Sequence, residues 1–314
     1  MVNYCFGIDL GGTSVKCGLF TVEGEVVDKW EIKTHVENEG TKILPDIART
    51  IRKKMQEREL TDADVKGVGI GIPGPVDKDG KIPGAVNLHW GPKDIEGELS
   101  SLCGLPVKAG NDANVAALGE MWKGGGAGAE NMILATLGTG VGGGIIVNGK
   151  MLVGYHGAGG EIGHASVNPH EEEYCNCGNR GCLEQYASAT GIARLARRAL
   201  KEWKGESSLK SRADSINAKV VFDAYKAGDA LAAQVVEEFA RILGRALANF
   251  ACVADPEVIV LGGGVSKAGE VLTRVVKKYY QEYAFLACKE PPIVLAQLGN
   301  DAGIYGAARL VLDM

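Results

Sequence analysis

Short apolar runs flank a glycine-rich turn at two places in this 314-residue chain. Residues 4–20 contain two such runs around the turn DLGGT at 9–13, and residues 132–147 contain two more around GTGVGGG at 138–144. Because each turn leads from one apolar run into another, each segment predicts a β-hairpin. A related arrangement that occurs twice in one chain favours two domains built on one plan, with the boundary near residues 105–115.

The rest of the chain alternates between strand and helix patterns. A strand is predicted at 257–261, directly before a third glycine-rich turn, GGGVS at 262–266. Apolar residues at helical spacing predict helices over 41–59, 111–122, 190–204, 229–254, 267–285 and 300–312. The segments 148–190 and 205–217 are predicted to be loops. Strands that alternate with helices place the chain in the α/β class.

Composition narrows the class of protein further. A net charge of −5 argues against a nucleic-acid binder, which needs a basic surface. No apolar run reaches the roughly 18 residues of a membrane-spanning helix, and the first residues lack the basic segment and apolar core of a signal peptide. We therefore expect a cytoplasmic enzyme without a membrane partner. In that compartment its eight cysteines are expected to stay reduced.

The glycine-rich turns are candidate phosphate sites. Successive backbone N–H groups in such a turn form an anion-binding concavity, and glycine lets a phosphate approach closely. A tight hairpin without a ligand remains the alternative for 9–13 taken alone. A Walker loop is absent and a dinucleotide fingerprint would open a helix, whereas both early turns lead into strands. Because the carboxylate of Asp9 would repel a bare phosphate, we expect a magnesium–nucleotide complex.

Residues 110–120, GNDANVAALGE, place two short polar side chains directly before a helical run. The structural interpretation is an N-cap, for which Asn and Asp are favoured at about 1 kcal/mol. In a chain with phosphate-binding turns, Asp112 also has the chemistry of a general base. Phosphoryl transfer to a hydroxyl needs a carboxylate that accepts the proton. We therefore predict Asp112 as the catalytic base.

Three thiols lie close together in CNCGNRGCLE at 175–184. The ligand type and number of Cys175, Cys177 and Cys182 with one histidine match a Cys₃His zinc site, and in a reducing compartment this is favoured over a disulfide. Spacing does not choose among the three nearby histidines His156, His164 and His170. The remaining cysteines are predicted to be small buried apolar residues, namely Cys5, Cys17, Cys103, Cys252 and Cys288.

These motifs together resemble the sugar kinase/hsp70/actin superfamily. The more particular likeness, across essentially the whole chain, is to the ROK family (repressors, open reading frames and kinases), and within it to bacterial glucokinases. The resemblance implies two ribonuclease-H-like domains with ATP and sugar in the cleft between them. It also implies that the final helix, about 298–314, returns to the N-terminal domain 1–110, while 111–297 form a larger domain with the zinc loop.

The resemblance assigns residues to roles. The family pattern GExGH followed by CxCGxxGCxE is matched at 160–184, which makes His164 the fourth zinc ligand. Asp112 corresponds to the family's base. The sugar is expected to contact Asn87, Asn111, Asp112, Glu161, His164 and Glu184. The loops 69–77 and 87–90 are expected on the sugar side, with plain connectors as the alternative. The nucleotide is expected at Asp9, Gly11, Gly12, Thr13, Gly138, Thr139, Gly140, Gly262, Gly263 and Gly264.

The activity implied is ATP-dependent phosphorylation of the 6-hydroxyl of glucose, a step of carbohydrate metabolism and glycolysis. Mg²⁺ and a structural Zn²⁺ are the expected ions, because four protein ligands leave zinc no open position for water. Fructose, mannose, N-acetylmannosamine and N-acetylglucosamine remain alternative acceptors. A sugar-responsive repressor would need a helix-turn-helix segment, and only eight residues precede Asp9. A non-catalytic sugar-binding protein is the third alternative. By resemblance, we expect a homodimer or homotetramer.

Overall fold

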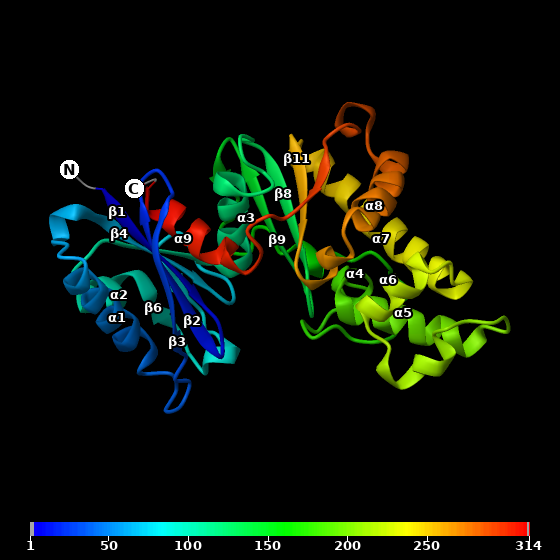
Figure 1. The fold of residues 1–314 in the computed structure, drawn as a ribbon, viewed down its shortest axis with the longest axis horizontal. Coiled ribbons are helices and arrows are strands. Elements are labelled where there is room, and N and C mark those ends of the chain that lie inside the picture. Colours follow the sequence, from blue (N-terminus) through cyan, green and yellow to red (C-terminus); the bar gives the residue numbers. More distant parts are fainter. Residues whose placement is uncertain (1–2, 313) are drawn as a thin grey trace. The chain divides into compact units, whose positions relative to one another are not determined.

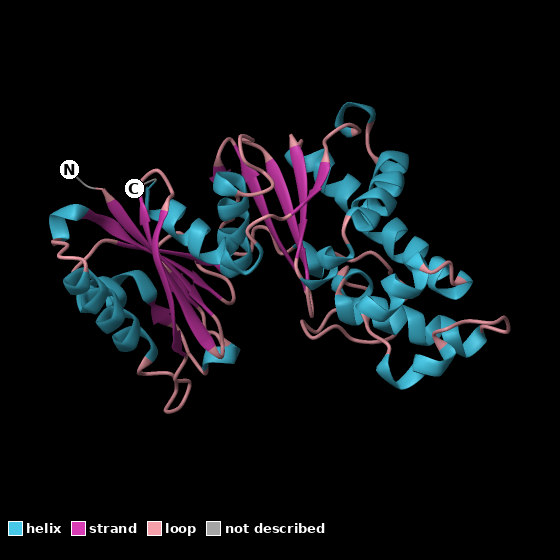
Figure 2. Cartoon of the chain, in the orientation of Figure 1, coloured by secondary structure: helices cyan, strands magenta, loops and turns pink. Residues whose placement is uncertain are grey.

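The computed structural model describes residues 3–312 and residue 314. The chain divides into two compact units, and its strands form two five-stranded sheets that pack with helices (Figures 1 and 2). The first unit comprises Met1–Gly128, Gly144–Gly160 and Gln297–Met314, and the second comprises Ala129–Gly143 and Glu161–Ala296.

The first sheet has the strand order β3-β2-β1-β4-β7. Its strands are β1 (Tyr4–Leu10), β2 (Ser14–Thr21), β3 (Val26–Lys33), β4 (Val65–Ile72) and β7 (Val107–Asn111). The pairs β1–β2 and β2–β3 are antiparallel, whereas β1–β4 and β4–β7 are parallel. The hairpin predicted around the 9–13 turn is therefore confirmed as β1 and β2.

The second sheet has the order β10-β9-β8-β11-β12. Its strands are β8 (Met132–Leu137), β9 (Val141–Val147), β10 (Lys150–Met151), β11 (Val258–Gly262) and β12 (Ile293–Leu295). Strand β11 is parallel to both β8 and β12, and β10 is antiparallel to β9. Numbered along the chain, both sheets have their strands in the order third, second, first, fourth and fifth. This shared order confirms the prediction of an α/β chain with two domains on one plan.

The predicted helices are also present, with shifts of a few residues at their ends. The first unit contains α1 (Ile43–Glu57), α2 (Ile95–Cys103), α3 (Asp112–Lys123) and α9 (Ala302–Leu312). The second contains α4 (Glu184–Ala187), α5 (Ala189–Glu202), α6 (Ala218–Lys226), α7 (Ala230–Ala254) and α8 (Glu270–Tyr283). A small antiparallel pair, β5 (Lys81–Ile82) and β6 (Lys93–Asp94), lies outside the two main sheets. Sequence patterns did not predict β3, β7, β12, α2 or α6.

Helices cover both faces of the first sheet (Figure 2). Helices α1 and α2 share one apolar core with the sheet, and α9 shares a second, smaller core with Cys5 and Phe20. The approach of α9 is close, since a Cβ at Gly69 of β4 would lie 1.7 Å from the carbonyl oxygen of Ala307. Only glycine permits this packing. The C-terminal helix thus belongs to the same unit as the N-terminal strands.

Several predictions differ from the structure. Cys252 was expected to be buried but is exposed, whereas the other four scattered cysteines are buried. The segment 148–190 was expected to be a loop but contains β10 and α4. Residues 69–72 were expected to open a loop, but they form the end of β4 and are buried between β1 and β7, so the loop starts after Ile72. The boundary was expected at residue 110, whereas 111–128 and 144–160 group with the first unit. The reason is the packing of α3 against α9, where a Cβ at Gly119 would lie 2.3 Å from the carbonyl oxygen of Ala302.

Within the described ranges 3–312 and 314, none of the helices has both the length and the apolar character needed to cross a membrane.

Candidate functional site

A cluster of four potential metal ligands lies in the second unit. His164 ends the 3₁₀ turn Ile162–His164, and the cysteines follow in the loop before α4. The ligand atoms of His164, Cys175, Cys177 and Cys182 all lie within 4.8 Å of one another. Cys177 Sγ is 3.6 Å from Cys182 Sγ, and Cys175 Sγ is 3.9 Å from His164 Nδ1.

These separations fit a tetrahedral zinc site. With zinc–sulfur and zinc–nitrogen bonds of about 2.3 and 2.0 Å, the ligand atoms of a tetrahedral Cys₃His site lie roughly 3.5–3.8 Å apart. The structure thus selects His164 from the three candidate histidines, while the ring of His156 packs at 4.7 Å against Tyr155. The cysteines of the cluster are all free thiols, so they remain available as thiolate ligands.

Two carboxylates flank this cluster from different sides. Glu184, at the start of α4, has Oε1 2.8 Å from Cys175 Sγ and 3.7 Å from His164 Nδ1. Glu161 has Oε2 4.0 Å from His164 Nε2, the ring nitrogen that faces away from the thiols. Zinc binding through Nδ1 would therefore leave Nε2 oriented beside Glu161. The structure brings together all three residues predicted to contact the sugar in this part of the chain.

A buried ion network joins the segment before the three cysteines to α5, and no sequence pattern predicted this network. Glu171 is 6% exposed and accepts hydrogen bonds from the guanidinium groups of Arg198 and Arg194 and from Tyr186 Oη. The Arg198 hydrogen bonds hold the pKa of this carboxyl well below its usual range. Arg194 and Arg198 stand one turn apart on α5, so the network fixes the zinc loop to that helix.

Two of the predicted phosphate turns lie next to each other in the second unit. A Cβ at Gly263 would lie 2.6 Å from the backbone of Leu137, the residue before the 138–140 turn. Gly263 also has φ +78°, a conformation that favours glycine. The start of α5 joins the same turn, since Thr190 Oγ1 donates to the carbonyl oxygen of Thr139 at 2.7 Å. Gly140 in turn lies against Glu184, whose Oε2 would be 2.6 Å from a Cβ there.

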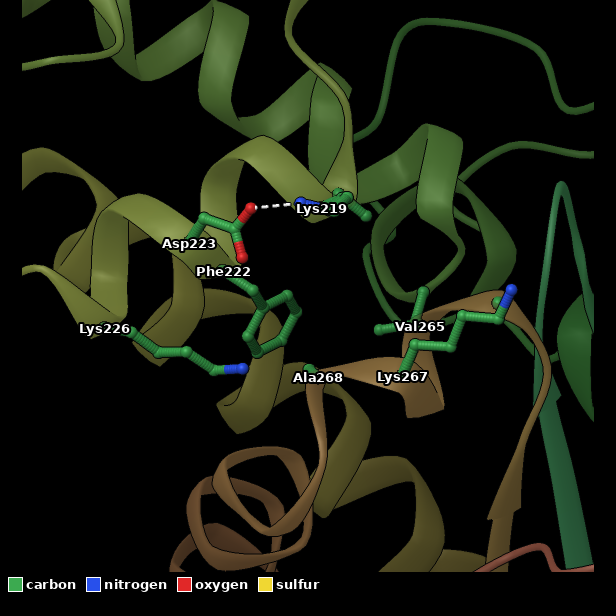
Figure 3. A pocket seen from close by; sticks show the side chains of 9 residues that line it. Lys219, Phe222, Asp223, Lys226, Val265, Lys267 and Ala268 are labelled. Carbon is green, nitrogen blue, oxygen red and sulfur yellow. Dashed lines mark hydrogen bonds and ion pairs between the residues drawn. The ribbon is translucent and has the colours of Figure 1, made fainter.

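A pocket opens beside the 262–264 turn (Figure 3). One wall comes from α6 and the other from the 3₁₀ turn Gly264–Ala268. Phe222 presents its ring between Lys226 on one side and Lys267 on the other (Figure 3). Lys219 is held by Asp223 at 2.6 Å. A flat apolar ring with the Lys226 ammonium group beside it and Lys267 on the opposite wall suits an aromatic, negatively charged ligand (Figure 3). Only Gly264 of this pocket was predicted, because α6 was not.

The third turn, 9–13, lies in the first unit. Asp9 stands opposite Lys16 in the β1–β2 register, and its burial raises the pKa of its carboxyl, an effect that Lys16 partly offsets. Gly12 and Thr13 are exposed. Asn87 lies beside them, since a Cβ at Gly12 would be 3.5 Å from the Asn87 carbonyl oxygen. The structure therefore groups Asp9, the turn and Asn87.

Asn87 belongs to a segment with alternating exposure. Leu88 and Trp90 are buried, whereas Asn87 and His89 are exposed. The buried pair anchors the segment and leaves the polar pair to face outward. The side chain of Asn87 is thus exposed, and its contact with a sugar stays a prediction.

Asp112 is the first residue of α3, and Asn111 is the N-cap. The Asn111 oxygen accepts from the backbone N–H groups of Ala113 and Asn114, and its amide donates to the Gly74 carbonyl at 3.1 Å. The prediction of an N-cap is therefore confirmed for Asn111, which is 8% exposed. The half-buried Asp112 accepts from Ala113 N through one oxygen, at 2.8 Å. Helix N-termini stabilise such a carboxylate.

Comparison with known proteins decides the family. The family description "ROK family" matches residues 5–314. The chain belongs to the ROK family. A ROK relative, the glucokinase of Halalkalibacterium halodurans, is 47% identical over 97% of this chain and 94% of its own length. The glucokinase of Thermotoga maritima is 37% identical, over 98% of this chain and 96% of its own.

Solved ROK structures agree with this placement. The ROK family glucokinase of Streptomyces griseus, in complex with glucose and AMPPNP, superimposes with a TM-score of 0.75 and 33% identity, over 98% of each chain. The ROK hexokinase of Thermus thermophilus gives a TM-score of 0.81 and 34% identity, over 98% of this chain and 97% of that one. The ROK sugar-kinase fold therefore extends over both units.

Proposed function

We propose that this protein is an ATP-dependent glucokinase that transfers the γ-phosphoryl group to the 6-hydroxyl of glucose. The observation that carries the proposal is the 47% identity to a glucokinase over almost the full length of both chains. The complex of a related glucokinase with glucose and AMPPNP supports both the acceptor and the donor.

In this proposal, Asp112 is the general base. A carboxylate at a helix N-terminus is held in place by the N-cap and the first turn, so it accepts the proton of the sugar hydroxyl without reorganising. The side-chain oxygen of Asn111 accepts the two capping hydrogen bonds of α3, and its amide donates a hydrogen bond to the Gly74 carbonyl oxygen. We therefore assign Asn111 to shaping the start of α3, with any hydroxyl contact coming from its second amide hydrogen.

The nucleotide is assigned to the glycine turns. The backbone of 138–140 and 262–264 would receive phosphate oxygens, and the pocket at Phe222 would receive the base. Asp9 and the 9–13 turn would hold the Mg²⁺–phosphate end, because a divalent cation beside the half-buried carboxylate would offset the burial that raises its pKa.

The zinc ligands are His164, Cys175, Cys177 and Cys182, and a bound Zn²⁺ would supply folding stability and no catalytic water. With zinc on Nδ1, the Nε2–H of His164 would then donate a hydrogen bond to a sugar hydroxyl, and the carboxylates of Glu161 and Glu184 would accept hydrogen bonds from sugar hydroxyls. We further propose a homodimer or homotetramer in the cytoplasm, which light scattering coupled to size-exclusion chromatography and fractionation would test.

A coupled ADP-release assay with a panel of sugars tests the proposal. Glucose is expected to be the best acceptor among glucose, fructose, mannose, N-acetylmannosamine and N-acetylglucosamine. Asp112→Asn should lower kcat by about 10²–10⁴-fold, the usual contribution of a general base, with the fold intact. Asp94→Asn is the matched control, because Asp94 caps α2 and Asn caps equally well. Retention of more than about a tenth of the activity by Asp112→Asn would refute its assignment.

A further inference from the structure

The chain passes between the two units four times, after residues 128, 143, 160 and 296. These four crossings are the covalent links between the units. Hinge motions concentrate in a few terminal or loop residues. The crossings at 128, 160 and 296 lie in loops, whereas the crossing at 143 lies within β9. The residues of the first unit that contact its ends of these links therefore affect any such motion.

One buried carboxylate holds two of them. Glu120, near the end of α3, has no exposed surface. Its Oε2 accepts from the backbone N–H of Gly125 at 2.7 Å, in the segment that leads to the crossing at 128. The same carboxylate accepts from Gln297 N at 3.0 Å and Leu298 N at 2.9 Å, directly after the crossing at 296. All of these residues belong to the first unit.

The other two links also meet α3. The buried side chain of Asn114 donates to the carbonyl oxygen of Gly159 at 2.8 Å, two residues before the crossing at 160. Gly144, directly after the crossing at 143, packs against the same helix, where a Cβ would lie 2.5 Å from the Cβ of Ala117. Helix α3 is thus a common support for the first-unit ends of all four links.

We infer that Glu120 and Asn114 are positioning residues that fix α3, and with it Asp112, to the links between the units. The inference rests on the proposed function in one respect, the role of Asp112. A buried carboxylate that accepts three backbone N–H groups is a strong, directional anchor. Glutamine would keep the shape but would turn an NH₂ group toward one of the donors, leaving buried N–H groups without an acceptor.

The effect should fall on turnover and not on nucleotide binding. Glu120 lies on α3, the first-unit helix that begins at Asp112, whereas the 138–140 and 262–264 turns belong to the second unit. A shift of about 1 Å in a reacting group can cost roughly 10²-fold in rate. We therefore expect Glu120→Gln to lower kcat by about tenfold or more while the KM for ATP changes by less than about threefold.

The experiment combines steady-state kinetics with amide hydrogen exchange on the intact protein. Glu120→Gln should increase exchange at Gly125, Gln297 and Leu298 by about tenfold, with exchange elsewhere unchanged. Ile51→Val is the control for general destabilisation, because Ile51 is a buried α1 residue outside this network. An equal fall of kcat in that control, or an unchanged kcat in Glu120→Gln with faster local exchange, would overturn the inference.

A second variant covers the case in which Glu120→Gln fails to fold. Gly124 has φ −117° and ψ −146°, so its φ lies outside the left-handed region that favours glycine. An added Cβ would lie 2.0 Å from Glu120 Oε2 and 2.9 Å from Glu120 Cα, so alanine would displace the carboxylate and the end of α3 with it. Gly124→Ala should therefore reproduce the fall in kcat. Gly91→Ala, where a Cβ meets nothing within 4 Å, should not. Equal kcat values in these two variants would overturn the inference.

The two proposals fail in distinguishable ways. If the unaltered protein phosphorylates no sugar of the panel, the proposed function falls. The exchange rates at Gly125, Gln297 and Leu298 still decide whether Glu120 anchors the links.

Discussion

Replacement of Glu171 by Gln is expected to destabilise the zinc loop more than any single change to its exposed charges. The side chain is 3% exposed and faces Arg194 at 2.9 Å and Arg198 at 3.0 Å. It also accepts from Tyr186 Oη at 2.5 Å and from the backbone N–H groups of Glu172 and Glu173, each at 3.1 Å. Removing one partner of a fully buried ion pair costs roughly 3–5 kcal/mol. The cost here is expected to fall below that range but above about 1 kcal/mol, because Glu173 still pairs with both partly exposed arginines while the buried N–H donors lose their acceptor.

Glu173→Gln is the matched control. Glu173 contacts the same two arginines, Arg194 at 3.0 Å and Arg198 at 2.6 Å, but its side chain is 59% exposed. Exposed ion pairs contribute about 0.2–1 kcal/mol. Urea unfolding of the zinc-loaded protein, followed by circular dichroism, measures both changes in the free energy of unfolding. A cost below about 1 kcal/mol for Glu171→Gln would refute the buried-network interpretation.

The same variant predicts a pH dependence. The hydrogen bonds from Arg198 hold the pKa of Glu171 well below its usual value of 4.5. Because the folded-state pKa is depressed, the contribution of the carboxylate is complete above the unfolded-state pKa and is lost as the pH falls toward the folded-state value. The stability difference between the parent protein and Glu171→Gln should therefore be constant near neutral pH and shrink below about pH 4.5. A difference that grows on acidification would contradict this sign.

Two further changes test the metal site and the nucleotide turn. Cys177→Ala, or removal of zinc with a chelator, should raise the KM for sugar by roughly tenfold and lower the thermal midpoint. Cys252→Ala, an exposed cysteine outside the cluster, should change neither, and an unaltered KM in zinc-free protein would refute the role of the metal. Asp9→Asn should lower kcat/KM for ATP by about 10²-fold. It should also raise the free energy of unfolding at neutral pH. Burial raises the folded-state pKa of the Asp9 carboxyl above its ordinary value of 3.8. The folded protein therefore loses stability as the pH rises from 3.8 through the folded-state pKa and Asp9 ionises. A variant that unfolds more easily without nucleotide would contradict this prediction.

Local patterns predicted a large part of the fold. The strands on either side of the 9–13 and 138–144 turns were predicted from a local pattern alone, in which apolar runs flank a glycine-rich turn. The helix that begins at Asp112 was placed by its short polar residues followed by apolar spacing. The cysteine spacing at 175–182 predicted a metal site because three thiols within eight residues can reach one ion. All of these signals are local in the sequence, and tertiary context does not change them.

Elements without such a signal were missed. Strand β4 reads as a glycine–proline loop from residue 69, yet residues 69–72 are strand. The glycine at position 69 is required by α9, whose backbone comes from a segment more than two hundred residues away in the sequence. Helix α6 was likewise missed, and with it the Phe222 half of the pocket in Figure 3.

The sequence by itself therefore determined the α/β class, the duplicated plan and the residue types of the candidate site. Only the tertiary structure decided that His164 meets the thiols, that α3 belongs with the N-terminal sheet, and that Glu120 and Glu171 are buried anchors while Glu173 is exposed. The physical reason is that burial and charge pairing depend on which distant segments pack together. A glutamate in a helix or loop carries the same local pattern whether it faces water or accepts hydrogen bonds in the core.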